Sequence, residues 1–288
     1  MQSVTPPRAP ESVTGLSFTD LLPDALCQER EDAIVKELLS GNVPAFMRSF
    51  VEVDASGKDA TGNERKLVFH VMADYLCVGD DDDFVRVPLN PLSAQAVADE
   101  FGCTLPTKKM VDIIWKAAAV HLDPSPIPPD AKMSTTKRFV EHNKKVETAR
   151  KVAGHALGKL LAGHKKDVVV TNRLLDSAGK FLKKVAIYGW QWLTGKVIQD
   201  LNPTSHDDKY ADYSHGIRLV ALDCTLEGSP ANVHEILADP ILWALLSDEG
   251  PMKFLKYPKK CPKCDRMIVN LHEEHVCNAN VVKDVHDR

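Results

Sequence analysis

The sequence has 288 residues, enough for one large domain or two smaller ones, and its 44% hydrophobic and 26% charged residues are typical of soluble globular proteins. A formal net charge of −4 excludes a global attraction to nucleic acid or anionic membranes. No stretch approaches the ~20 apolar residues that span a bilayer, and residues 1–10 lack the features of a signal peptide. We therefore expect a cytoplasmic protein with no membrane partner.

The N-terminal part of the chain, residues 15–121, is predicted to be an α+β unit. It follows residues 1–14, which are rich in Pro, Ser and Thr and are expected to form a disordered arm. Apolar residues at helical spacing predict helices at residues 24–40, 91–101 and 107–121. Apolar and β-branched runs predict strands at residues 66–78 and 84–89.

Residues 122–134 are predicted to be a proline-rich linker or a strap across the surface. Four prolines between residues 122 and 130 remove backbone donors and fix φ, which excludes a helix. This segment is the best candidate for a boundary within the body of the protein.

The second part, residues 135–250, is predicted to be α+β and to carry the candidate site. A long helix at residues 135–161 is followed by a change to strand periodicity. The predicted strands are residues 167–171, 184–190 and 216–222, with a hairpin at 190–199 that turns at Thr194–Gly195 and a last helix at 231–249. Short turns join these strands, so we expect an α+β fold with a mixed or antiparallel sheet and flanking helices.

The last segment, residues 251–288, is predicted to be a small zinc-binding module. Cys261 and Cys264 have the C-x2-C spacing that directs two thiolates at one ion, and a closed structural site needs four ligands. His275 and Cys277 are two residues apart and face the same way on an extended segment. The sequence therefore predicts one structural zinc per chain, with His272 as the rival fourth ligand.

Residues 257–278 resemble the short C2HC zinc knuckles and ribbons, which serve as structural clips, protein contacts or nucleic-acid contacts. The alternatives are a redox-active C-x2-C pair and an internal disulfide. A thiolate zinc site fits a reducing compartment, in agreement with a cytoplasmic location. Basic residues give the module a positive face that could contact phosphates, although nucleic acid is not favoured as a partner. They are Lys253, Lys256, Lys259, Lys260, Lys263 and Arg266.

A second concentration of polar residues lies between residues 164 and 218. They occur at the ends of expected strands, where the scaffold fixes the backbone while side chains stay reachable. The candidate catalytic residues are His164, Lys166, Asp167, His206, Asp212, Ser214, His215 and Arg218.

If the segment around Ser214 is extended, strand alternation puts Asp212 and Ser214 on one face and His215 on the other. Ser214 and His215 then cannot act together as nucleophile and base. A dyad would need Ser214 with His164 or His206, or His215 would activate a water molecule.

Residues 214–218, Ser-His-Gly-Ile-Arg, resemble the Ser-His-Gly-Cys-Ile-Arg motif of the L,D-transpeptidases. The nucleophilic cysteine of that motif has no counterpart here, and Cys224 lies several residues downstream. The resemblance therefore implies no transpeptidase activity for this chain.

Three interpretations of the polar residues remain. In the first, three of the five residues His164, Asp167, His206, Asp212 and His215 hold a second, catalytic metal with an open position for water. In the second, a histidine oriented by an aspartate acts as general base while a lysine or arginine holds an anionic group. In the third, all of these residues are structural.

We expect a hydrolase-like enzyme with an unidentified small or polymeric substrate. In this hypothesis His215 or His206 acts as base or metal ligand, Asp212 orients it, and Arg218 and Lys166 bind an anionic or carbonyl group. The alternative is a non-enzymatic zinc-containing module that contacts nucleic acid or a protein partner.

Overall fold

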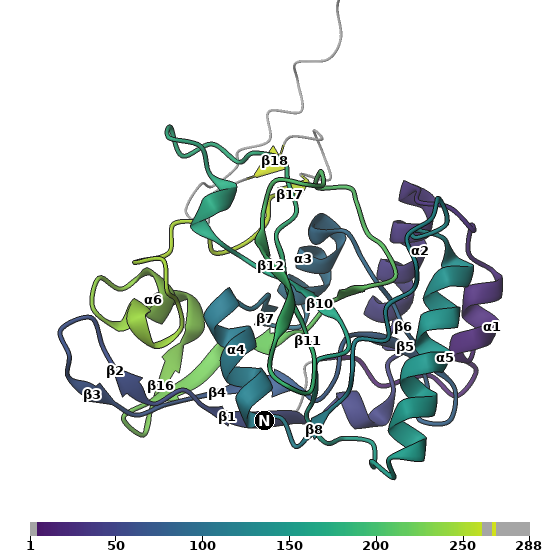
Figure 1. Ribbon diagram of the computed structural model, residues 1–288, viewed down its shortest axis with the longest axis horizontal. Helices are drawn as coiled ribbons and strands as arrows, with labels where there is room; N and C mark the ends of the chain where they lie inside the picture. Colours follow the sequence, from purple (N-terminus) through teal and green to yellow (C-terminus); the bar gives the residue numbers. More distant parts are fainter. Residues whose placement is uncertain (1–4, 261–266, 269–288) are drawn as a thin grey trace, which may run out of the picture.

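A six-stranded antiparallel sheet draws its strands from both halves of the chain (Figure 1). The computed structural model describes residues 5–260 and 267–268. The strands of this sheet are β1 (Phe50–Asp54), β4 (Leu67–Met72), β7 (Cys103–Thr104), β14 (Val220–Ala221), β15 (Asp223–Leu226) and β16 (Ser229–Asn232). Their order is β16-β15-β4-β14-β7, and β1 also pairs with β4. Strands from before and after the proline-rich segment therefore share one sheet and one core.

A second, four-stranded sheet carries three of the eight predicted site residues, Lys166, Asp167 and His215. Its strands are β10 (Lys166–Val168), β11 (Ile187–Gln191), β12 (Val197–Asn202) and β13 (His215–Gly216), in the order β12-β11-β10-β13. β10 pairs with β11 antiparallel and with β13 parallel, so this sheet is mixed. Four two-stranded ladders complete the strands: β2 (Gly57–Lys58) with β3 (Glu64–Arg65), β5 (Cys77–Gly79) with β6 (Phe84–Arg86), β8 (Val120–His121) with β9 (Leu161–Ala162), and β17 (Lys259–Lys260) with β18 (Met267–Ile268).

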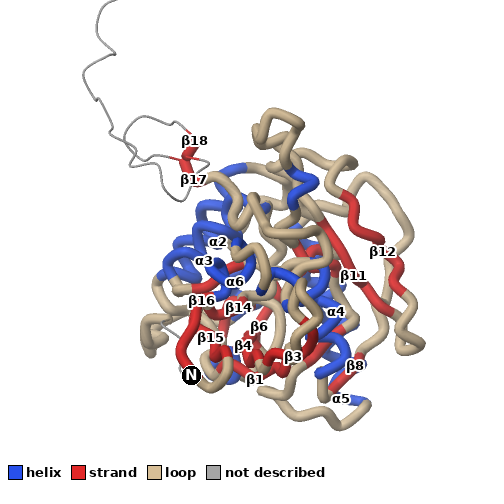
Figure 2. The backbone as a smooth tube through the Cα atoms, turned by 90° about the vertical axis from the view of Figure 1, so that its left-hand side faces the viewer, coloured by secondary structure: helices blue, strands red, loops and turns tan. Residues whose placement is uncertain are grey.

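The helices cover and separate the two sheets. They are α1 (Gly15–Asp20), α2 (Gln28–Leu39), α3 (Pro91–Glu100), α4 (Lys108–Ala117), α5 (Thr136–Val152) and α6 (Val233–Ala238), with 3-10 turns η1 (Ala45–Met47), η2 (Asn172–Leu174) and η3 (Leu242–Leu245). α4 packs on β1 of the first sheet and on β11 of the second, so it lies between the sheets, as Figure 2 shows. In the part of the chain that the structure describes, no helix is long and apolar enough to cross a membrane.

Strong local signals predicted several elements correctly. The helices expected at residues 24–40, 91–101 and 107–121 are confirmed as α2, α3 and α4. The Asn90 side chain caps α3 by accepting the N–H groups of Leu92 and Ser93, and Pro91 occupies the first helical position. The hairpin at residues 190–199 is also confirmed, as β11 and β12, and the α+β class with an antiparallel sheet holds.

Several predicted elements are shorter than expected. The helix expected to reach residue 161 ends at Val152, and Gly154 follows with φ of 69°, the left-handed conformation that ends helices. The strand expected at residues 66–78 is interrupted at residues 73–76. The helix expected at residues 231–249 divides into α6 and η3, and β16 takes its first residues.

Strands from both expected α+β parts lie in one sheet. The proposed boundary does not separate two cores, because β4 is paired with both β1 and β15. Residues 122–134 follow the strap alternative, in which the carbonyl of Pro124 accepts the Trp190 indole N–H at 3.1 Å. Within the expected arm Thr5 is buried, and the Arg48 guanidinium donates to its carbonyl and hydroxyl oxygens.

Candidate functional site

Parallel pairing of two short strands brings the ends of the predicted polar region together. In the β10–β13 pair, Lys166 lies opposite His215 and Asp167 lies opposite Gly216. These residues are about fifty positions apart in the sequence, so only the sheet makes them neighbours. The pairing explains why a lysine and a histidine from different segments share one site.

Residues 212–215 form a turn, so the extended conformation considered from the sequence is wrong. The N–H of His215 donates to the carbonyl of Asp212 at 3.1 Å. Asp212 Oδ1 accepts the N–H of Ser214 at 2.8 Å and its hydroxyl at 2.6 Å. An aspartate that binds the N–H two residues ahead favours a turn over a strand. The turn brings the Asp212 carboxylate and the His215 ring into electrostatic contact.

Five side chains from three segments form what we call the outer cluster: Lys166, His206, Tyr210, Asp212 and His215. The rings of His206 and Tyr210 stack with centroids 3.9 Å apart, and Tyr210 meets His215 edge-on at 5.7 Å. The Tyr210 hydroxyl donates to Asp212 Oδ2 at 3.1 Å. His206 and Tyr210 are half-buried, whereas Asp212 and His215 are buried. The outer cluster thus leads from the surface to a buried carboxylate.

The charge states of the outer cluster follow from burial and mutual contact. Burial raises the pKa of Asp212, but His215, Lys166 and the Ser214 hydrogen bonds outweigh it and lower this pKa to about 2. Burial lowers the pKa of His215 to about 4 against the opposing effect of Asp212. Burial also lowers the pKa of His206. At neutral pH the cluster therefore holds a carboxylate beside two neutral imidazoles.

The remaining predicted residues belong to a separate, buried network, which we call the inner cluster. Its members come from strands β6 and β10 and from the loops that join β4 to β5, β9 to β10 and β13 to β14. They are Asp74, Tyr75, Arg86, His164, Asp167 and Arg218, all buried.

One half of the inner cluster is centred on the Asp74 carboxylate. The Arg86 guanidinium donates to it from Nε at 3.1 Å and from the terminal nitrogen at 2.5 Å, and His164 Nε2 lies 3.1 Å from Asp74 Oδ1. Burial opposes ionisation of Asp74, but Arg86 and His164 hold its pKa well below the usual range. Burial lowers the pKa of His164 to about 4.

The other half of the inner cluster is centred on Asp167. The Tyr75 hydroxyl donates to Asp167 Oδ2 at 2.8 Å, and Arg218 Nε lies 3.7 Å from Asp167 Oδ1. Burial raises the pKa of Asp167 to about 6. The Arg218 guanidinium lies over the Tyr75 ring and donates to the carbonyls of Met72 and Leu161. Arg218 is therefore committed to the protein interior.

The inner cluster leaves no room for a substrate. A space of about 10 Å³, lined by Tyr75, Asp167 and Arg218 among others, has the size needed for roughly one water molecule. The buried amine of Lys165 lies near both clusters and donates to the carbonyl of Tyr213. Burial lowers its pKa to about 7. We interpret the inner cluster as the support of the outer one.

The structure thus divides the eight predicted residues into two groups. It brings together Lys166, His206, Asp212, Ser214 and His215. His164, Asp167 and Arg218 lie in the inner cluster instead, and the Ser214 hydroxyl hydrogen-bonds Asp212.

Sequence reasoning missed several members of both clusters. Asp74 was the detectable one, because a carboxylate inside the apolar run 66–78 needs a buried partner. Arg86 lies among apolar residues in the strand expected at residues 84–89 and is that partner. No sequence spacing predicts the contacts of Tyr210, because they depend on the fold of the loop before β13.

Comparisons with protein-family models, with curated proteins and with solved structures gave no match. The site must therefore be interpreted from its own geometry. Within residues 5–260 no group of three or more His, Cys, Asp or Glu side chains is arranged to hold a metal ion.

The four predicted zinc ligands, Cys261, Cys264, His275 and Cys277, lie outside the described residues, as does the rival His272. The hairpin that flanks the first two is described. Lys259 pairs with Ile268 and Lys260 with Met267.

Proposed function

We propose that this chain is a hydrolase-like enzyme that uses the outer cluster for general-base catalysis. His206 is the general base, Asp212 stabilises the imidazolium that forms, and Lys166 binds the developing oxyanion of a carbonyl or phosphoryl group. His215 is a positioning residue, because it is buried against Asp212. The observation that carries the proposal is the link through Tyr210. Its ring stacks on half-buried His206, and its hydroxyl donates to the buried Asp212 carboxylate.

The charge states support this assignment. A general base must be unprotonated at the working pH, and the lowered pKa of His206 keeps its imidazole neutral. The carboxylate of Asp212 is ionised and receives three hydrogen bonds. Lys166 is held over the Trp190 ring, with the ammonium 4.8 Å from the ring centroid, which fixes its direction beside the cluster.

Local backbone strain beside Lys166 also supports a site here. Trp190 has φ of 60°, a conformation that bulky residues rarely adopt. The pairing of β11 with β12 shifts register between Ile187 and Gly189, as at a β-bulge. Strained residues and bulges cost free energy that the surrounding structure must offset. They are found most often at functional sites, where they direct a side chain.

The proposal is tested by measuring hydrolysis of p-nitrophenyl acetate, an acyl p-nitroanilide and bis-p-nitrophenyl phosphate. We expect turnover of at least one of them, and a decrease of about 100-fold or more for His206→Gln, the range for loss of a general base. His155→Gln, which alters a histidine outside both clusters, is the matched control. The absence of turnover for all three substrates, or an unchanged rate for His206→Gln, would reject the proposal.

The pH profile separates catalysis from a structural effect. Asp212 raises the pKa of His206, so Asp212→Asn lowers it further. The acidic limb of the rate profile should therefore move to lower pH in Asp212→Asn, while the maximal rate falls. An acidic limb that stays in place would show that Asp212 does not act on the base.

We also propose one structural zinc per chain, bound by Cys261, Cys264, Cys277 and His275. The β17–β18 pairing supports this, because it brings together the chain on either side of the C-x2-C pair. Metal analysis should give one zinc per chain, lost in Cys261→Ser and retained in Cys27→Ser. A chain without zinc, or one that keeps it in Cys261→Ser, would contradict the assignment.

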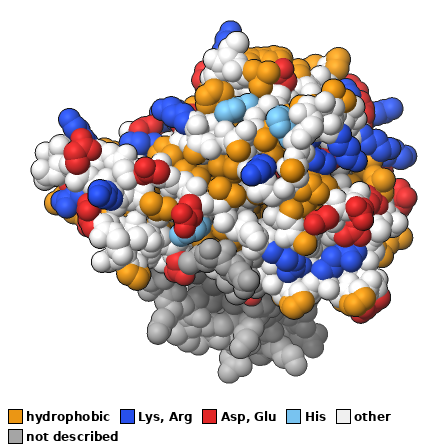
Figure 3. Space-filling view, turned by 90° about the horizontal axis from the view of Figure 1, so that it is seen from below, with side chains coloured by type: hydrophobic (Ala, Val, Ile, Leu, Met, Phe, Trp, Pro, Cys, Tyr) orange, Lys and Arg blue, Asp and Glu red, His pale blue; other side chains and the backbone are white. Residues whose placement is uncertain are grey.

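The binding-module alternative has less support in the described residues. On the face shown in Figure 3, basic, acidic and hydrophobic side chains are interspersed. A surface that binds nucleic acid needs clustered lysine and arginine. Salt-dependent retention of the protein on immobilised nucleic acid would favour this alternative.

A further inference from the structure

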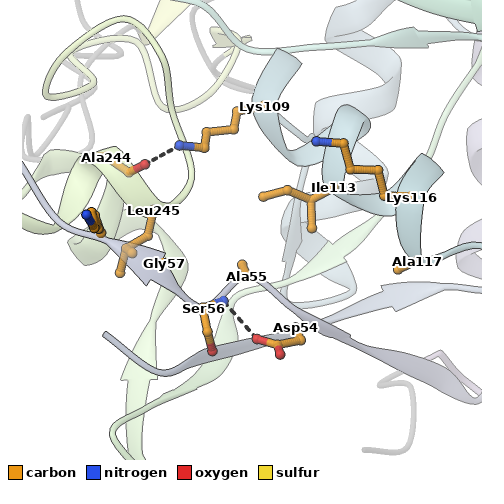
Figure 4. Close-up of a pocket in the computed structure, with 11 residues that line it drawn as sticks. Asp54, Ala55, Ser56, Gly57, Lys109, Ile113, Lys116, Ala117, Ala244 and Leu245 are labelled. Atoms are coloured by element: carbon orange, nitrogen blue, oxygen red, sulfur yellow. Dashed lines mark hydrogen bonds between the residues drawn. The ribbon is translucent and has the colours of Figure 1, made fainter. Parts of the chain in front are cut away.

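A cavity of about 370 Å³ lies apart from both clusters, where α4 faces β1, β2 and η3. Its volume is within the range of roughly 300–1,000 Å³ that is usual for small-molecule sites. Figure 4 shows Ile113 and Lys116 projecting from α4 towards the space above Ala55. None of the predicted site residues lines it, so it has no part in the proposed hydrolysis.

The wall of this cavity combines an apolar floor with a cationic rim. Ala55 and Leu245 are buried, Ile113 is half-buried, and all three line the cavity. Lys109 and Lys116 are seven positions apart on α4, two helical turns, so both lie on the face that carries Ile113. An apolar body and an anionic group would therefore be accommodated side by side.

The lysines of the rim differ in how far they are already paired. Lys109 donates to the carbonyl of Ala244 and lies 3.7 Å from Asp248 Oδ1. Lys58 and Lys116 are exposed, and neither forms an ion pair with any described residue. Asp54 is the acidic residue of the lining, and its carboxylate accepts the N–H of Ser56 at 2.8 Å.

We propose that this cavity binds a small organic anion, a carboxylate or phosphate attached to an apolar body. The lining has three lysines and one aspartate, and because Asp248 pairs with Lys109 one positive charge remains in excess, in a chain whose net charge is −4. The unpaired ammonium groups of Lys58 and Lys116 hold the anionic group, and Ile113 and Leu245 contact the apolar body. The site is independent of the outer cluster.

The test uses 8-anilinonaphthalene-1-sulfonate, a fluorescent aromatic anion, with the full chain at low ionic strength. We expect saturable binding of one probe per chain, and a dissociation constant raised about fivefold in the double variant Lys58→Gln/Lys116→Gln, which corresponds to ~1 kcal/mol for the two exposed charges together. The matched control is Lys144→Gln/Lys151→Gln, which alters two exposed lysines of α5. N-phenyl-1-naphthylamine, an uncharged relative of the probe, should bind both double variants equally.

Competition distinguishes the two anionic groups. Displacement of the probe by benzoate but not by phenyl phosphate assigns a carboxylate ligand, and the reverse result assigns a phosphate. Absence of saturable binding, displacement by neither anion, or an equal affinity in the two double variants would overturn the proposal.

Discussion

Burial keeps the imidazoles of His142, His164 and His215 neutral. His215 is an example, because neither of its ring nitrogens has a hydrogen-bond partner within the described residues. Removal from water without a compensating partner penalises the charged imidazolium most. The neighbouring Asp212 carboxylate reduces this penalty without cancelling it. Neutral imidazole beside ionised carboxylate is consequently the resting state of the outer cluster.

We expect His215 to make the stability of the protein depend on pH. Its pKa is about 4 in the folded chain and about 6.5 in the unfolded chain, so between these values the unfolded chain binds more protons. The stability that neutral His215 contributes is complete above pH 6.5 and is lost as the pH falls towards 4. Relative to His215→Gln, the wild-type chain should lose about 1–2 kcal/mol of unfolding free energy between pH 7.5 and 5.0.

Urea unfolding of both proteins at the two pH values measures this loss. His155→Gln provides the comparison for a histidine outside the clusters. An equal change with pH for the wild-type chain and His215→Gln would show that His215 does not titrate differently on folding.

Strand β13 has only two residues, yet it joins the two clusters. Its partner β10 carries Lys166 towards the outer cluster and Asp167 towards the inner one, as alternation requires. The strand can lie this close because Gly216 has no side chain. An added Cβ at Gly216 would lie 2.5 Å from the Tyr75 ring and 2.7 Å from Lys165 Cβ.

Gly216→Ala should therefore destabilise the protein by about 1–3 kcal/mol, the usual cost of overpacking. Gly57→Ala is the matched control, because an added Cβ there meets nothing within 4 Å, and we expect it to change stability by less than about 0.5 kcal/mol. Chemical denaturation of both variants decides the matter. Equal stability of the two would mean that β13 can move away from Tyr75 at no cost.

At the scale of the whole molecule, one sheet joins the two halves of the sequence. β4 pairs with β1 from the first half and with β14 and β15 from the second, so neither half can complete the sheet alone. The buried Arg218 from the second half also donates to the carbonyl of Met72 in the first. Folding of residues 5–260 should therefore be cooperative.

We expect a single unfolding transition, with coincident curves from tryptophan fluorescence and far-UV circular dichroism. Fragments 1–134 and 135–288 should each lack a cooperative transition when produced separately. Two separated transitions in the intact chain, or a folded isolated fragment, would show that the proline-rich segment is a domain boundary after all.

The sequence by itself determined the features that depend on neighbouring residues. Periodic apolar residues, a capping asparagine and a Thr-Gly turn act over a few positions, so α3, α4 and the β11–β12 hairpin could be predicted. The polar region at residues 164–218 was also evident, because its composition differs from that of the surrounding apolar strands.

Only the tertiary structure decided which polar side chains meet. The β10–β13 pairing and the turn at residues 212–215 assemble the outer cluster from segments about fifty residues apart, and no local pattern specifies such a pairing. His164 contacts Asp74, which is paired with Arg86, and therefore belongs to the inner cluster and not to the outer one. Charge pairing in a low-dielectric interior depends on distance in space, and that distance is fixed only when the whole chain has folded.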